Sequence, residues 1–226
     1  MQKYIDSHCH FFCPSIDKDV GAICNATNPT EWMLIAELVD KSKSLYGAVG
    51  VHPWFISGLM SDWQDELYSL LIKNPDLMVG EIGLDKYHDD LSGQINVFIA
   101  QLNTAYNLNR GICVHCVGMW HQLLQILKQN KNVLPRFVLA HCYSGPVKDI
   151  KKMAENYNMY FSYGFRNLQN SACVLSTPLN RILAETDSDT PSDVIRVVNR
   201  IAEILNIAPD KMADIIYENT IRMLKL

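Results

Sequence analysis

Tyr4-Ile5-Asp6-Ser7-His8-Cys9-His10, near the amino terminus, is the stretch on which the interpretation of the whole chain depends. It opens with apolar residues and is therefore expected to form the end of a first strand. Side chains alternate faces along a strand, which places Asp6, His8 and His10 on one face. Two imidazoles on one face can reach the same cation, and a nearby carboxylate can orient a ring or add charge. A His-x-His pair is equally compatible with ordinary polar residues at a strand end, so the later chain has to decide.

The later chain repeats one pattern, in which an apolar strand ends in a polar residue and a segment with helical periodicity follows. The expected strands after the first cover residues 21–26, 46–52, 77–85, 111–115, 136–141, 159–164 and 181–187. Between them, apolar side chains recur at the spacing of one buried helical face. An example is the helix expected to begin at Ser92, with Ile95, Ile99, Leu102 and Tyr106 on its inner face. Strands that are apolar on both faces indicate a parallel sheet covered by helices.

Eight strands alternating with helices predict an α/β fold, a slightly distorted (β/α)8 TIM barrel that forms one domain over residues 1–226. An open doubly wound sheet is the structural alternative. No Gly-rich phosphate loop follows the first strand, which argues against the nucleotide-binding versions of that sheet. Only residues 11–20 separate the first two strands, a short distance for a parallel crossover. This connection is expected to be a loop, so the first crossover helix would be missing.

Composition narrows the choice of function and location. The net charge is -4, 48% of the residues are hydrophobic, and no run of Lys or Arg would attract a polyanion. The seven cysteines are an odd number scattered along the chain, which does not resemble a disulfide framework and indicates a reducing compartment. No apolar run reaches the length of a signal peptide or a membrane span. A cytoplasmic protein, monomeric and without membrane contact, is expected.

Residues with metal-binding chemistry gather at the expected carboxyl ends of the strands, where the active sites of barrels lie. In chain order they are His8, His10, His52, Glu81, His115, His141 and Asp187. A single His at a strand end is usually a hydrogen-bonded polar residue. This many imidazoles and carboxylates meeting at one mouth would be poorly satisfied without a cation. The sequence therefore predicts a metal site.

The motif series resembles that of the TatD-like metal-dependent hydrolases, the TatD DNase family of the amidohydrolase superfamily. The stretches that carry the resemblance are Asp6-Ser7-His8-Cys9-His10, Gly50-Val51-His52-Pro53, Gly80-Glu81-Ile82-Gly83-Leu84-Asp85, His141-Cys142-Tyr143-Ser144-Gly145, Glu185-Thr186-Asp187 and Glu218-Asn219-Thr220. Characterised members of this family are chiefly metal-dependent deoxyribonucleases. The resemblance implies a barrel hydrolase that acts on DNA or a small phosphodiester.

The resemblance also implies two divalent cations. His8, His10 and Asp187 would hold the first, His115 and His141 would hold the second, and Glu81 would bridge the pair. The fourth strand has no Lys, so the carboxylated lysine that bridges metals in other members of the superfamily is unavailable. Imidazole and carboxylate ligands suit zinc, manganese or magnesium, and ligand type alone does not choose among them.

The implied mechanism is hydrolysis by a metal-activated water. The cations would acidify the water and polarise the oxygen under attack, and Asp187 would act as general base beside the bridging carboxylate of Glu81. His52 is expected to touch the substrate. Trp54 would either stack on a base or ring of the substrate or pack against the protein. Glu185 would either orient a ligand or be a satisfied core carboxylate.

One departure from the family pattern bears on the substrate. That pattern places Arg two residues after the fifth-strand His, where this chain has Val117. Because Arg is a preferred partner of phosphate, this departure favours an alternative: a metal-dependent amidohydrolase or esterase, such as a deacylase or lactonase, acting on a small carbonyl substrate. A third reading is a non-enzymatic metal-binding scaffold that recruits a partner, and the intact series of ligands argues against it.

Overall fold

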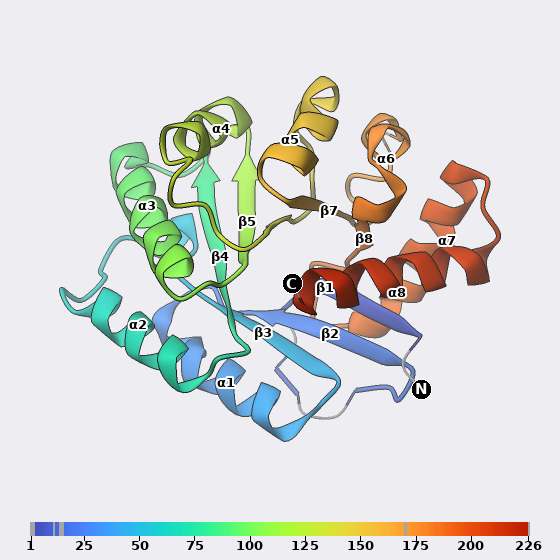
Figure 1. Ribbon diagram of the computed structural model, residues 1–226. Helices are drawn as coiled ribbons and strands as arrows, with labels where there is room; N and C mark the ends of the chain where they lie inside the picture. The colour runs from blue at the N-terminus through green and yellow to red at the C-terminus, as the bar shows by residue number, and fades with distance from the viewer. Residues whose placement is uncertain (1–2, 11, 14–15, 170, 226) are drawn as a thin grey trace.

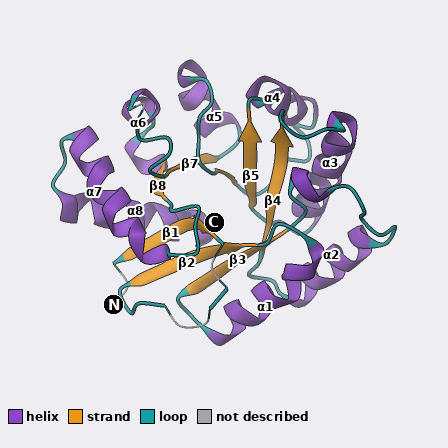
Figure 2. Cartoon of the chain, turned by 180° about the vertical axis from the view of Figure 1, so that it is seen from behind, coloured by secondary structure: helices purple, strands orange, loops and turns teal. Residues whose placement is uncertain are grey.

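The computed structural model describes residues 3–10, 12–13, 16–169 and 171–225. Its strands form one sheet in which each strand is parallel to the next along the chain. The strands are β1 (Tyr4–Cys9), β2 (Val20–Asn25), β3 (Leu45–Val49), β4 (Met78–Asp85), β5 (Ile112–Val117), β6 (Val138–Ala140), β7 (Met159–Tyr163) and β8 (Ile182–Ala184). Helices surround these strands on the outside (Figure 1), and the view from behind shows the same ring (Figure 2). The predicted barrel is therefore confirmed.

The outer layer consists of α-helices that alternate with the strands from β2 onward. They are α1 (Trp32–Lys41), α2 (Trp63–Lys73), α3 (Leu91–Asn107), α4 (Trp120–Gln129), α5 (Ile150–Asn156), α6 (Ala172–Ser176), α7 (Val194–Leu205) and α8 (Pro209–Lys225). Between β1 and β2, residues 12–13 and 16–19 contain no helix, as expected for a missing first crossover, while residues 11 and 14–15 lie outside the described part. Of the helices described, none combines the length and apolar character needed to cross a bilayer.

The alternation of side chains along the strands places a layer of apolar residues directly beneath the polar residues of the site. Cys113 on β5 and Leu139 on β6 belong to a buried apolar cluster formed mostly by alternate strand residues. His115 and His141 follow two positions later in the chain. Because residues i and i+2 of a strand share a face, the polar residues at the barrel mouth rest on this apolar layer.

Side-chain hydrogen bonds join the two ends of the sheet. No strand ladder links β8 to β1 among the described residues, so the barrel is nearly closed rather than fully closed. Asp6 Oδ1 accepts a hydrogen bond from Thr186 N at 3.0 Å, and Asp6 Oδ2 accepts one from Thr186 Oγ1 at 2.5 Å. Asp187 N donates to His8 O at 3.0 Å. Asp6 therefore connects β1 to the segment after β8 rather than orienting an imidazole ring. This connection brings His8 beside Asp187.

Helix α3 buries a different face from the one that apolar periodicity predicts. Leu102 is buried as expected, but Tyr106 is 46% exposed, and Gln94 and Gln101 are buried instead. The two glutamine amides exchange hydrogen bonds with main-chain groups that follow β4 and β3. A search for apolar spacing overlooks buried amides of this kind, because their polar groups are satisfied by main-chain atoms outside the helix. These bonds fix the carboxyl ends of two strands that contribute to the site.

Gly83 on β4 approaches β5 so closely that no side chain fits. A Cβ at this position would lie 1.8 Å from the main-chain oxygen of His115. Gly83→Ala is expected to lower the free energy of unfolding by ~3 kcal/mol, because the two strands must move apart to relieve the overlap. Urea denaturation measures the loss. Gly58→Ala is the control, since its φ is +89° but nothing lies within 4 Å of the added Cβ. It should cost only about 1 kcal/mol, and equal losses would contradict the steric argument.

Candidate active site

Glu81 on β4 is the centre of the site and is only 2% exposed. Its two carboxylate oxygens face different groups of imidazoles. Oε2 lies 3.4 Å from His8 Nε2 and 3.6 Å from His10 Nε2. Oε1 lies 2.8 Å from His141 Nε2 and 3.0 Å from His115 Nδ1. One buried carboxylate thus stands between two sets of potential metal donors.

The first set contains His8, His10 and Asp187. Asp187 Oδ1 lies 3.8 Å from His8 Nε2 and 3.4 Å from His10 Nε2. His8 Nε2 is buried and has no hydrogen-bond partner among the described residues. A buried polar atom without a partner is uncommon, and this one faces the oxygens of two carboxylates. Imidazole nitrogens and carboxylate oxygens in such an arrangement fit a divalent cation.

The second set surrounds Glu81 Oε1. His115 Nδ1 lies 3.4 Å from His141 Nε2, and His52 Nε2 lies 3.4 Å from Glu81 Oε1. The ring of His8 stacks on that of His141 with centroids 3.9 Å apart, so the two sets adjoin. His52 was expected only to touch the substrate. Its position beside Glu81 and His115 also places it within reach of a cation bound by these residues.

Two further carboxylates lie behind the imidazoles. Asp85 Oδ2 is 3.0 Å from His115 Nε2, and Glu185 Oε1 is 3.7 Å from His141 Nδ1. Partners of this kind determine which ring nitrogen faces the site. Two roles were predicted for Glu185: orienting a metal ligand, or being a satisfied core carboxylate. It has features of both, because it faces the imidazole of His141 and also accepts a hydrogen bond from the buried hydroxyl of Ser162. The sequence analysis did not identify Asp85 as a partner of His115. Its position four residues after Glu81 on the same strand could have indicated that both side chains share a face.

Trp54 lies at the rim of the site. Its indole Nε1 donates to Asp85 Oδ2 at 2.8 Å, and its ring stacks on His88 with centroids 4.7 Å apart. The side chain is nevertheless 49% exposed. Trp54 therefore packs against the protein and still presents ring surface to the cavity, so the geometry accommodates both of its predicted roles.

The central carboxylates favour the ionised form despite their burial. Burial raises the pKa of Glu81, but the charges of His141 and His8 and the hydrogen bonds from the imidazoles outweigh it and hold this pKa well below its usual range. Burial also opposes ionisation of Asp187, yet the hydrogen bond with His10 and the charge of His8 lower its pKa to about 2. Burial lowers the pKa of His141, but the carboxylates of Glu81 and Glu185 together outweigh it and raise this pKa well above its usual value. The site thus concentrates negative charge that a proton or a cation must balance.

A cavity of about 670 Å³ opens onto this cluster. Among the described residues, Arg166 is the only Lys or Arg that lines it, and Arg166 Nη1 lies 3.2 Å from Asp187 Oδ2. Val117, which replaces the Arg of the family pattern, lines the same cavity. Sequence reasoning missed Arg166. Its place just beyond the carboxyl end of β7 was the available signal, since such loops build the active sites of barrels.

The fold and these side chains together define a class of protein. A parallel barrel whose mouth presents imidazole nitrogens and carboxylate oxygens to an open cavity is the arrangement of metal-dependent hydrolases. Three groups of these donors could hold a metal ion: His8, His10 and Asp187; His8, Glu81 and His141; and His52, Glu81 and His115.

Comparison with known proteins identifies the family within this class. The family model described as TatD related DNase matches residues 5–225, so the chain belongs to that family and the resemblance read from the motifs is confirmed. An uncharacterized metal-dependent hydrolase, MJ1582 of Methanocaldococcus jannaschii, is 26% identical, with 99% of this chain and 97% of the relative covered. The 3'-5' ssDNA/RNA exonuclease TatD of Escherichia coli is 25% identical, with 74% of this chain and 67% of that protein covered. The crystal structure of YjjV, a TatD homologue from Escherichia coli, has a TM-score of 0.88 at 23% identity and covers 99% and 98% of the two chains.

Proposed function

We propose that this protein is a divalent-metal-dependent phosphodiesterase that acts on DNA, RNA or a small phosphodiester. The observation that carries the proposal is the placement of Glu81, whose two oxygens face two separate groups of imidazoles at 2.8–3.6 Å. The relatives named as exonucleases support the substrate class. The direct test is turnover of single-stranded oligonucleotides and model diesters with added manganese or magnesium. Intact substrates under all these conditions would overturn the proposal.

The proposed centre holds two cations. His8, His10 and Asp187 would bind one, and His115 and His141 would bind the other, with Glu81 shared between them. When bound, such ions polarise the phosphoryl oxygen and lower the pKa of a water toward about 7. Zinc, manganese and magnesium are the proposed candidates, because the donor set mixes imidazoles with carboxylates.

The remaining chemistry belongs to the chain itself. Asp187 Oδ1 faces the imidazoles, whereas Oδ2 accepts a hydrogen bond from Arg166 at 3.2 Å. In the proposed mechanism the carboxylate of Asp187 accepts a proton from the attacking water. The low pKa of Asp187 keeps this carboxylate ionised at neutral pH. His52 and Trp54 line the same cavity, which supports the proposal that they contact the substrate.

Arg166 supplies the cationic contact that Val117 cannot. Its guanidinium is 81% exposed and lines the cavity, so it can bind a phosphate oxygen while it holds Asp187. Arg166→Gln is expected to lower kcat/KM for a model phosphodiester by about 10–100-fold, the effect of losing a charged hydrogen bond in the transition state. Steady-state kinetics measure this. Arg196→Gln, also on the protein surface, is the matched control and should stay within about twofold. Equal activity of Arg166→Gln and wild type would remove Arg166 from substrate binding.

The alternative substrate class is a carbonyl compound. Val117 favours it, because this side chain makes part of the cavity wall apolar where a phosphate-binding Arg stands in the family pattern. A panel of esters, lactones and amides separates the two functions. Turnover of that panel that is insensitive to Arg166→Gln, without turnover of any phosphodiester, would favour the carbonyl alternative.

We also propose that the protein is a single-domain monomer that works in the cytoplasm. Free thiols agree with a reducing compartment. They are found at Cys13, Cys24, Cys113, Cys116, Cys142 and Cys173. Sedimentation of the metal-loaded protein would measure the oligomeric state, and a dimer at micromolar concentration would contradict the monomer.

A further inference from the structure

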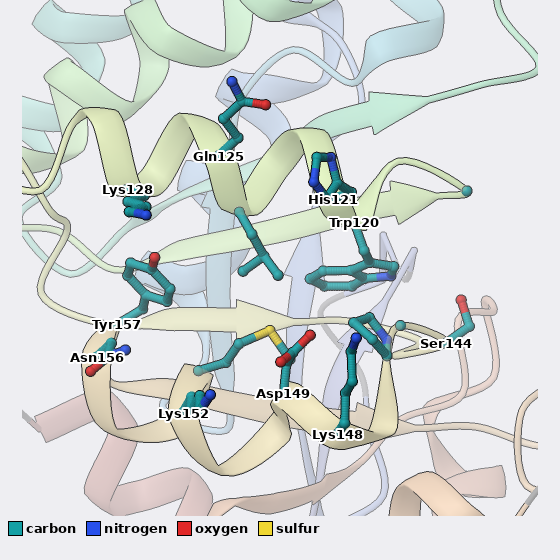
Figure 3. Close-up of a pocket in the computed structure, with 15 residues that line it drawn as sticks. Trp120, His121, Gln125, Lys128, Ser144, Lys148, Asp149, Lys152, Asn156 and Tyr157 are labelled. Carbon is teal, nitrogen blue, oxygen red and sulfur yellow. The ribbon is translucent and has the colours of Figure 1, made fainter.

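A groove of about 850 Å³ lies on the outside of the barrel, apart from the active-site cavity. One wall is α4, and the other is formed by η3 (Val147–Asp149) and α5 (Figure 3). The groove and the active-site cavity meet at Ser144, which lines both. Helix α4 has ten residues and therefore runs for about 15 Å beside the groove. A chain whose end occupies the active site has a direct path into this groove.

The groove is basic although the protein as a whole is acidic. Lys128 stands on α4, and Lys148 and Lys152 stand on the opposite wall (Figure 3). All three side chains are exposed, and none takes part in an ion pair with another described residue. Asp149 is the one carboxylate among the lining residues. The whole chain has a net charge of -4, so it has no general attraction for a polyanion. The excess of positive charge in the groove would attract a polyanion to this part of the surface.

Other lining groups suit the remaining parts of a nucleotide. Tyr157, which is half-buried, contributes aromatic surface on the α5 side. Trp120, near the junction with the active site, is 6% exposed, and its indole N–H donates to no described acceptor. The indole nitrogen itself is buried, so it is not open to a ligand in the groove.

We propose that this lysine groove binds the sugar–phosphate chain of a single-stranded nucleic acid whose scissile bond lies in the active-site cavity. The proposal rests on the proposed phosphodiesterase function and adds where the rest of the substrate lies. Lys148 and Lys152 are four residues apart on one wall, and Lys128 faces them, so successive phosphates pass between cations. Binding along this path also explains how an acidic protein retains a polyanionic substrate.

The test compares long and short substrates in metal-loaded protein. The groove variant is Lys128→Gln/Lys148→Gln/Lys152→Gln, and the matched control is Lys43→Gln/Lys73→Gln/Lys211→Gln, which removes the same charge from exposed positions near α1, α2 and α8. The probes are an oligothymidylate of about twelve nucleotides, within the usual range of single-strand sites, and bis(p-nitrophenyl) phosphate. For the oligonucleotide, the groove variant should lose at least about tenfold in kcat/KM, and the slope of log kcat/KM against log salt should become shallower by about 2. Its turnover of the small diester should stay within about twofold of wild type.

Several results would overturn the proposal. Equal losses in the groove and control variants would show a general charge effect, and an equal loss on the small diester would place the lysines in catalysis or folding. Direct binding of the labelled oligonucleotide, measured by anisotropy, separates this proposal from the proposed function. If wild type cleaves no phosphodiester but binds the oligonucleotide through the three lysines, only the catalytic proposal fails. If wild type binds a polyglutamate peptide through these lysines and binds no oligonucleotide, the groove serves an acidic protein partner and our proposal fails.

Discussion

Glu81→Gln is expected to reduce kcat/KM by at least about 1,000-fold, because it removes the one carboxylate that both sets of imidazoles face. The amide retains the shape of the side chain but replaces an acceptor oxygen with an N–H₂ donor. Whichever way it turns, one set then faces a group that cannot bind a cation. The second measurement is metal content after dialysis, which should fall from about two ions per chain toward one or none.

The control separates this effect from loss of the fold. Glu66→Gln makes the same chemical change on the exposed side of α2 and should stay within about twofold of wild type. Circular dichroism of Glu81→Gln should match that of wild type. Full metal content combined with full activity in Glu81→Gln would refute the shared carboxylate, whichever substrate the enzyme uses.

Asp187→Asn is expected to lower kcat by about 100- to 10,000-fold, the contribution of a general base. The amide can still present an oxygen to the cation beside His8 and His10, but it cannot accept the proton of the attacking water. KM should change much less than kcat, because the Arg166 guanidinium remains available to the phosphate.

Two comparisons identify what Asp187 does. Asp189→Asn changes an exposed carboxylate two residues later and should stay within about twofold of wild type. Metal content of Asp187→Asn distinguishes its two roles. A loss of kcat with the metal retained identifies the base, whereas loss of one ion identifies a ligand whose removal dismantles the centre. Unchanged kcat would refute both.

Local patterns in the sequence were sufficient for the barrel and for the imidazoles that meet at its mouth, but not for Asp85 or Arg166. The strands near His115 and His141 are visible as apolar runs followed by an imidazole, and helical spacing fills the intervals. Parallel strands connected by helices place all their carboxyl ends at one mouth. The residues therefore had to converge once the chain formed a barrel, whatever the details of its loops.

Regular alternation along β4 predicts the wrong face for Glu81, the central residue of the site. Met78 belongs to the inward-facing apolar cluster, so regular alternation would turn Glu81, three residues later, to the outside. The register of β4 against β5 shifts between Val79 and Ile82, and this irregularity returns Glu81 to the inner face. Strand register depends on the neighbouring strand and is not encoded by the local apolar pattern.

The sequence by itself thus determined the family, the barrel and most of the chemical groups at its mouth. Only the tertiary structure decided which atoms meet: the division of Glu81 between two sets of imidazoles, the contact of Arg166 with Asp187, and the lysine groove that joins the cavity at Ser144. The physical reason is that these contacts depend on register, loop paths and side-chain packing between segments far apart in the chain. Periodicity reports only which face a residue occupies within its own segment.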